Sequence, residues 1–204
     1  LGPTDRAVII GEEGNGKSSL LKTIVDPSLV EDYCEYSGKV LKNGMLVGYL
    51  EQDTPPEILE MTPAEFLDGP ALLDGSLSRL AAQLQLREEL LFADQRIATL
   101  SGGEKAFVAI AIYFAILKVN PAPFVILDEI EAALDDVNVA KYARYLRGMT
   151  GHTQFIAITH RRGTMEEADV LYGVTMQEEG VSKLIELRVG ELEEKLGIGA
   201  GQNA

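Results

Sequence analysis

The chain has 204 residues, a length that suits one domain and is ample for a buried core. Its 18 basic and 32 acidic side chains give a formal net charge of −14, which repels nucleic-acid phosphates and anionic membrane surfaces. We therefore expect no membrane association, and direct nucleic-acid binding by this chain is unfavoured. The single cysteine, Cys34, cannot form an internal disulfide, and no secretory signal is recognisable, so we expect a cytoplasmic protein.

The first half alternates strand-like and helix-like segments, which predicts an α/β fold with a mostly parallel sheet flanked by helices. We expect a strand over 7–10 and a helix over 17–25. The Lys42-Asn43-Gly44 turn lies between two strand-like runs and predicts a hairpin over 39–50. A small helical insert follows. It opens with the capping box Thr62-Pro63-Ala64-Glu65 and continues with apolar residues at helical spacing, Leu77, Leu80, Ala81 and Leu84.

The second half continues the alternation of strand-like and helix-like segments, and the ends of these segments are more clearly marked. Thr164 to Glu167 repeats the capping pattern, and the segment 197–204 is glycine-rich, which predicts a flexible tail. Residues 1–196 are therefore predicted to form a single domain. Its expected elements here are a helix from Ser101, a strand over 124–127, a helix over 136–147, a strand over 154–158, and a closing antiparallel pair over 170–176 and 183–189 around Glu179-Gly180.

The first chemical motif is Gly11-Glu12-Glu13-Gly14-Asn15-Gly16-Lys17-Ser18, which fits the P-loop pattern at every fixed position. Its glycines allow successive backbone N–H groups to face phosphate oxygens. Lys17 is expected to reach the β- and γ-phosphates, Ser18 to bind Mg²⁺ and Ser19 to contact the α-phosphate. A chance glycine-rich turn is the alternative. The apolar strand before the motif and the helix after it favour phosphate binding.

The second motif is an apolar strand, 124–127, that ends in Asp128 and Glu129. An aspartate in this position holds Mg²⁺ in P-loop enzymes, and the next acid can polarise an attacking water. Alone, these two acids are more readily explained as solvated turn residues. Together with the P-loop, they predict a hydrolytic nucleotide site.

The third motif is Leu100-Ser101-Gly102-Gly103-Glu104, which without context is a helix-capping box. Between a P-loop and an acidic strand end, it resembles the signature of ABC-type ATPases. The resemblance implies that Ser101, Gly102 and Gly103 contact the γ-phosphate of ATP held by an opposite subunit. An exposed helix N-terminus is a suitable anion site.

Three further residues resemble ABC landmarks and follow in the same order. Gln52, in the run 48–52, resembles the Q-loop glutamine that contacts Mg²⁺ and water. Asp135, after Ala133-Leu134, resembles the D-loop aspartate at the dimer interface. His160 resembles the switch histidine near the γ-phosphate. A lone histidine after a strand is usually a loop residue, but its five companions favour the functional interpretation.

Two branches of this superfamily are recognisable. From about 5 to 99 the chain resembles an ABC-F ATPase, the soluble translation-associated branch, through 10–18 and 48–52. From about 100 to 189 it resembles the C-terminal head lobe of a bacterial SMC chromosome-segregation ATPase, through 121–124, 127–136 and 163–176. We therefore expect a P-loop NTPase fold of the ABC or SMC-head type, with a P-loop lobe over 5–99 and a signature and Walker-B lobe over 100–189.

The chain also departs from both branches. Lys17 and Ser101 are only 84 residues apart, which leaves no room for the long coiled coil between the two lobes of an SMC protein. No aromatic residue precedes Gly11, so stacking on adenine and base selectivity are expected to be weak. These departures lead us to expect a fragment or a fusion of two lobes, natural or engineered.

The resemblance implies ATP binding and hydrolysis with Mg²⁺ at composite sites that form when two copies, or this chain and a related head, pair head to tail. The process implied is chromosome condensation or segregation. Three alternatives stay open. They are an ATP-gated dimerisation module with negligible turnover, an ABC-F-like translation-associated ATPase, and a fusion that folds but binds no nucleotide.

Overall fold

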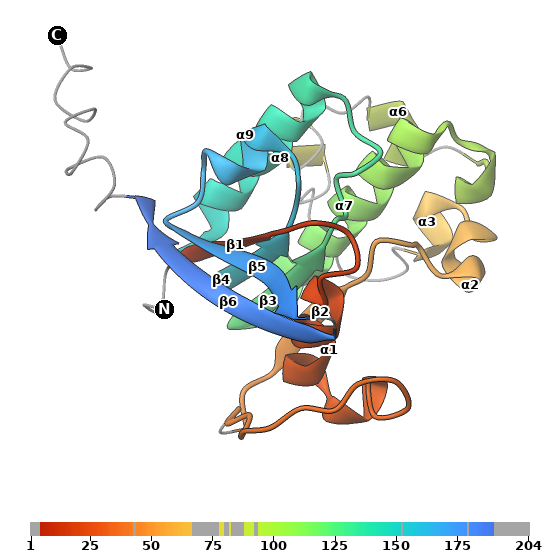
Figure 1. Cartoon of the computed structure of the whole chain (residues 1–204). Coiled ribbons are helices and arrows are strands. Elements are labelled where there is room, and N and C mark those ends of the chain that lie inside the picture. Colours follow the sequence, from red (N-terminus) through yellow and green to blue (C-terminus); the bar gives the residue numbers. More distant parts are fainter. Residues whose placement is uncertain are drawn as a thin grey trace, which may run out of the picture.

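The computed structural model describes residues 5–42, 44–66, 78–79, 82, 88–91, 94–151, 153–178 and 180–189. A six-stranded sheet lies at the centre, with helices on both faces (Figure 1). The strands are β1 (Arg6–Ile10), β2 (Val47–Leu50), β3 (Phe124–Asp128), β4 (Gln154–Ile158), β5 (Val170–Glu178) and β6 (Val181–Arg188). The helices are α1 (Lys17–Val25), η1 (Pro27–Leu29), α2 (Pro56–Leu59), α3 (Pro63–Phe66), α6 (Glu88–Leu91), η2 (Ile97–Thr99), α7 (Gly102–Val119), α8 (Asp136–Met149) and α9 (Arg162–Met165).

The strand order is β2-β3-β4-β1-β5-β6, so strands from the first and second halves of the chain are interleaved. All neighbours from β2 to β5 pair in parallel, and only β5 and β6 are antiparallel. The predicted α/β fold with a mostly parallel sheet is confirmed. Parallel pairing also brings the carboxyl ends of β1, β2, β3 and β4 to one edge of the sheet.

Both faces of the sheet are covered, as parallel strands require. Because successive side chains of a strand point to opposite faces, Val125 and Leu127 of β3 join the core under α7 and α8, whereas Ile126 packs on the side of α1. Helix α7 is apolar almost all round and contributes Ile110 and Phe114, at most 1% exposed, to the larger core. Within the described residues no helix combines the length and apolar character needed to cross a membrane.

Several local predictions are confirmed. The capping box at Thr62 forms, with the Glu65 N–H donating to the Thr62 hydroxyl at 3.2 Å and the Thr62 N–H to the Glu65 carboxylate at 2.8 Å. A second capping box, between Ser101 and Glu104, opens α7. The predicted closing pair is the β5–β6 hairpin, in which Val170 pairs with Arg188.

Two local predictions are wrong. Residues 39–42 form no strand, although a turn hydrogen bond of 2.7 Å from the Met45 N–H to the Lys42 carbonyl is present. Strand β2 pairs with β3 instead, because β3 offers a continuous parallel ladder and buried neighbours. Thr164 does not cap a helix, since it lies buried inside α9 and donates its hydroxyl to Glu131. The segment 197–204 and the apolar positions predicted for the insert, Leu77, Leu80, Ala81 and Leu84, lie outside the described residues.

Candidate functional site

An open pocket of about 570 Å³ lies at the carboxyl edge of the parallel strands. In open α/β sheets this edge is where ligands bind. The loop after β1, the segment after β2, the acid after β3 and the loop after β4 all reach it. The residues that line it are Gly11, Glu13, Gly14, Gly16, Lys17, Ser18, Ser19, Gln52, Glu129, Thr159 and His160.

The glycine-rich loop has the backbone that the P-loop motif requires. Gly14 and Gly16 have φ values of 82° and 81°, in the left-handed region that favours glycine. Lys17, 9% exposed, donates its ammonium group to the carbonyls of Gly11 at 3.0 Å and Glu12 at 2.9 Å. The loop therefore holds a positive charge at the start of α1, where a phosphate would be attracted.

The β5–β6 hairpin holds this loop in place through two hydrogen bonds. Asn15 donates its side-chain amide to the Val174 carbonyl at 3.2 Å, and Ser182 donates its hydroxyl to the Asn15 carbonyl at 2.7 Å. A Cβ on Gly11 would lie 2.4 Å from the Val174 carbonyl oxygen, and one on Gly16 would lie 2.8 Å from the Ser182 hydroxyl. Glycine is therefore needed at Gly11 because of the nearby backbone, and at Gly16 chiefly because of its left-handed φ of 81°.

Asp128 lies at the end of β3 and is 6% exposed. Its Oδ1 accepts a hydrogen bond from the Ser18 hydroxyl at 3.2 Å, and its Oδ2 accepts one from the Tyr49 hydroxyl of β2 at 3.3 Å. Burial and the nearby Asp128 carboxylate raise the pKa of Tyr49 above its ordinary value, so this hydroxyl remains a donor. Both carboxylate oxygens are thus held by side chains from the first half of the chain.

The oxygens of Ser18 and Asp128 suit Mg²⁺, which prefers hard oxygen ligands and usually binds through one or two protein groups together with phosphates and water. Among the described residues, no group of three or more His, Cys, Asp or Glu side chains could form a metal cage. The Ser18 and Asp128 oxygens fit a cation that takes its other ligands from phosphate and water.

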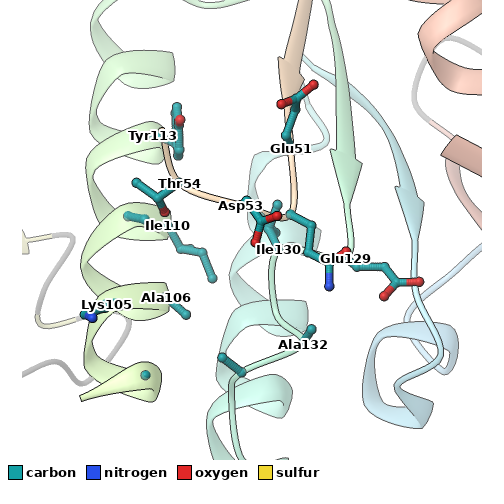
Figure 2. Close-up of a pocket in the computed structure, with 14 residues that line it drawn as sticks. Glu51, Asp53, Thr54, Lys105, Ala106, Ile110, Tyr113, Glu129, Ile130 and Ala132 are labelled. Atoms are coloured by element: carbon teal, nitrogen blue, oxygen red, sulfur yellow. The ribbon is translucent and has the colours of Figure 1, made fainter. Parts of the chain in front are cut away.

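Glu129 has a φ of 51°, which is rare for a residue other than glycine. Such a conformation costs of order 1–3 kcal/mol and is often found at functional sites. Its N–H donates to the Ile158 carbonyl at 3.1 Å, and its Oε2 lies 3.7 Å from Nδ1 of His160. Figure 2 shows the Glu129 carboxylate pointing away from Lys105 and Ala106 of α7. The turn thus directs this acid toward the loop after β4.

A neighbouring pocket of about 200 Å³ lies between the segment after β2, α7 and the turn after β3 (Figure 2). Gln52 and Glu129 line both pockets and so form part of the wall between them. Of the signature residues, Gly102 lines this second pocket.

None of the predicted signature residues Ser101, Gly102 and Gly103 lines the P-loop pocket, and neither does Asp135. Ser101 caps α7 and donates its hydroxyl to the Glu104 carboxylate at 2.7 Å. Asp135 caps α8 and accepts the Asn138 N–H at 2.8 Å. The structure therefore brings together the P-loop, Asp128, Gln52, Glu129 and His160 in one chain but leaves the signature residues outside their pocket.

Four residues near this site were not predicted from the sequence. Glu13 and Thr159 line the pocket, and their positions inside the P-loop and directly after β4 could have indicated this. Tyr49 and Ser182 hold Asp128 and Asn15 in place. No sequence signal indicated these two contacts, because each depends on pairing between strands far apart in the chain.

Comparisons with known proteins identify the family of the chain. The chain matches the family described as "RecF/RecN/SMC N terminal domain" over residues 64–183, more than half of its length. It is 62% identical over 100 residues to the chromosome partition protein Smc of Bacillus subtilis, and 63% identical over 95 residues to that of Clostridium kluyveri. These matches cover 49% and 47% of the chain, but only 8% of either relative.

Solved structures show the same fold. An Smc head bound to the C-winged helix domain of ScpA has a TM-score of 0.68 at 22% identity, covering 93% of this chain and 92% of that one. The archaeal ribosome recycling factor aABCE1, in complex with the stalk protein aP1, has a TM-score of 0.71 at 22% identity, covering 95% of this chain and 40% of that one. At this identity the likeness concerns the fold alone. With the family match over more than half of its length, the chain belongs to the RecF/RecN/SMC N-terminal domain family and has the fold of an ABC/SMC-head-type P-loop ATPase.

Proposed function

We propose that this chain is an ATPase head that binds ATP with Mg²⁺ and hydrolyses ATP when two heads pair. One observation carries the proposal. The P-loop, Glu129 and His160 line one pocket, and the buried Asp128 is hydrogen-bonded to Ser18 of that loop. Enzymatic phosphoryl transfer depends mainly on positioning and on neutralising charge. A pocket that gathers these groups suits that reaction.

The loop from Gly11 to Gly16 is the proposed phosphate cradle. Lys17 would exchange its two carbonyl acceptors for phosphate oxygens, and Ser19 would contact the α-phosphate. Ser18 and Asp128 would hold Mg²⁺, assisted by Gln52. When bound, this ion neutralises phosphate charge and orients the leaving group.

Glu129 is the residue that we assign to the attacking water. Its carboxylate accepts a proton as the water oxygen bonds to the γ-phosphorus and the bond from that phosphorus to the bridging oxygen breaks, which yields ADP and phosphate. The Nδ1 atom of His160, 3.7 Å from Glu129 Oε2, helps to hold the Glu129 carboxylate in place. Gln52 orients the water from another wall of the pocket.

The signature residues are the reason to propose two heads. Ser101 and Gly102 lie exposed at the N-terminal end of α7, an 18-residue helix, with Gly103 next to them. This end attracts anions, but these residues do not line the P-loop pocket of their own chain. The γ-phosphate that they contact would belong to a nucleotide on another head, with Asp135 at the interface. The partner is a second copy of this chain or a related head.

The wider role is proposed from the relatives, which are named chromosome partition proteins. We place this head, residues 1–196, in cytoplasmic chromosome condensation or segregation. The net charge of −14 disfavours direct contact with DNA, so partner subunits would supply the basic surface. The ABC-F resemblance of residues 5–99 stays a prediction.

The test is the molar mass of the Glu129→Gln protein, by light scattering after size exclusion, with and without Mg-ATP. Phosphate release by the unmutated chain is measured in parallel. We expect a monomer that becomes a dimer only with ATP, and phosphate release that is lost in the variant. Lys17→Ala serves as the control that binds no nucleotide, and Ser101→Arg as the control that binds nucleotide without dimerising.

Each other outcome has a definite meaning. ATP-dependent dimers of the unmutated chain without phosphate release would establish a dimerisation module instead of an enzyme. Undiminished turnover in the Glu129→Gln protein would remove the role assigned to this acid. A protein whose mass and melting temperature do not respond to nucleotide would overturn the proposal.

A further inference from the structure

A buried acid that the proposed mechanism does not use lies between the two loops of the site. Glu131, 1% exposed, is in the turn between β3 and α8, two residues after Glu129. Its Oε1 accepts a hydrogen bond at 3.0 Å from the hydroxyl of Thr164, which is 3% exposed and lies in α9. The contact joins the turn after β3 to the helix that follows the His160 loop.

Burial acts against the charged form of Glu131. Burial raises the pKa of this carboxyl, and the hydroxyls of Thr159 and Thr164 oppose the shift only in part. Glu131 Oε2 and the fully buried Tyr142 hydroxyl of α8 have no hydrogen-bond partner among the described residues. Burying such groups is costly, so a role for this arrangement is to be expected.

Other contacts join the same two loops. The Thr159 hydroxyl accepts the Arg161 N–H at 2.9 Å, which shapes the backbone on both sides of His160. The Arg161 guanidinium donates to the Leu134 carbonyl at 2.7 Å, and the Leu134 N–H donates to the Glu131 carbonyl at 2.9 Å. The turn that carries Glu129 and the loop that carries His160 are thus joined by these two contacts, in addition to the backbone bond from the Glu129 N–H to the Ile158 carbonyl.

We propose that Glu131 is a positioning residue that holds the Glu129 turn against the His160 loop, so that the two side chains reach their places together. The expected effect on catalysis rests on the proposed function. The contact between Glu131 and Thr164 itself is present in the protein without nucleotide and can be tested there. A misplacement of about 1 Å in a catalytic group can cost roughly a hundredfold in rate, so the loss of this contact should be measurable in kcat.

The chain offers a matched pair of variants. Thr164→Val removes the hydroxyl that donates a hydrogen bond to Glu131 Oε1 at 3.0 Å. Thr153→Val removes a hydroxyl that is equally buried and donates at 3.0 Å to the Ala122 carbonyl, on the far edge of the sheet. Any general destabilisation should be similar in both, because the chemistry and the burial are alike. Glu131→Gln and Glu131→Leu complete the set, since Gln keeps the acceptor and Leu lacks it.

The experiment measures kcat and nucleotide Kd, together with hydrogen exchange of the amides of residues 129–135 and 158–165 in the nucleotide-free protein. We expect Thr164→Val and Glu131→Leu to lower kcat about tenfold or more, with Kd changed less than about threefold. Exchange should rise in both segments. Glu131→Gln should keep most of the activity and the slow exchange, and Thr153→Val should match the unmutated chain.

Two results would overturn the inference. One is a kcat for Glu131→Leu within about twofold of the unmutated value, and the other is a loss that Thr153→Val reproduces. If the unmutated chain releases no phosphate, the proposed function fails, and hydrogen exchange alone tests the positioning role of Glu131. Unchanged exchange in the two segments would then refute it.

Discussion

Tyr49→Phe tests whether the β2 strand supports the proposed Mg²⁺ site. The substitution removes only the hydroxyl that donates to Asp128 Oδ2 at 3.3 Å and leaves the ring, which packs with the core beside α1. Asp128 keeps the Ser18 hydroxyl on its other oxygen, at 3.2 Å. The variant therefore loosens the carboxylate without removing it.

The expected size of the effect follows from this contact. A hydrogen bond to a charged group contributes about 1.5–3 kcal/mol. The distance is at the long end for an O–H donor and the Tyr49 ring is only half-buried, so we take about 1 kcal/mol. Because about 1.4 kcal/mol corresponds to a tenfold change, Mg²⁺ should bind roughly fivefold more weakly. This is somewhat below the 10- to 100-fold typical of groups that orient a metal ligand.

The assay is a Mg²⁺ titration of fluorescent ATP-analogue binding, with the midpoint concentration as the readout. Tyr172→Phe is the matched control, because its hydroxyl also donates to a carboxylate, Glu186, at 3.2 Å but away from Asp128. The midpoint should rise for Tyr49→Phe and stay constant for Tyr172→Phe. Equal midpoints in the two variants would refute the reasoning.

Two predictions concern stability. Gly148 lies in α8, and a Cβ there would meet no atom within 4 Å apart from the neighbouring backbone of its own helix. Gly148→Ala should therefore raise the free energy of unfolding by about 0.5 kcal/mol in urea titrations, and a decrease would contradict this. Hydrogen bonds from Arg6 hold the pKa of Asp169 below its usual range, so the stability from this pair is present above the unfolded pKa of about 3.9 and is lost as pH falls through the folded value. Asp169→Asn should cost roughly 1 kcal/mol at pH 6, since the carboxylate is 42% exposed and screened, and this difference should shrink below pH 4; a constant difference would exclude the linkage.

Motifs that lie within one continuous segment were predictable from the sequence. The run from Gly11 to Ser18 has its strand before it and its helix after it, and residues 124–128 form the predicted strand with its acid. Parallel pairing then explains why Gln52, Asp128 and His160 come together, because each follows or ends a strand whose carboxyl end lies at the same edge. Most residues of the pocket could therefore be predicted from local motifs and from the rule that the carboxyl ends of parallel strands lie at one edge of a sheet.

Contacts that depend on the order of strands were not predictable. The run before Gly44 has strand-like composition, yet β2 pairs with β3. Pairing with a buried parallel neighbour removes more apolar surface from water than pairing with an exposed hairpin strand. Thr164 has the spacing of a cap but is buried against Glu131. In both places tertiary packing overrode a local pattern, since the sequence alone does not say which strand or side chain will be adjacent.

The interleaved strands bear on how the two resembled lobes fit together. Strand β1 lies between β4 and β5, and β2 lies beside β3, so the boundary between residues 5–99 and 100–189 crosses the centre of the sheet. The same boundary crosses the site, because Ser18 and Tyr49 of the first segment hold Asp128 of the second. A poor fit between the segments would displace the Asp128 carboxylate before it exposed much apolar surface. Nucleotide and Mg²⁺ affinity are therefore more sensitive measures of their compatibility than the melting temperature.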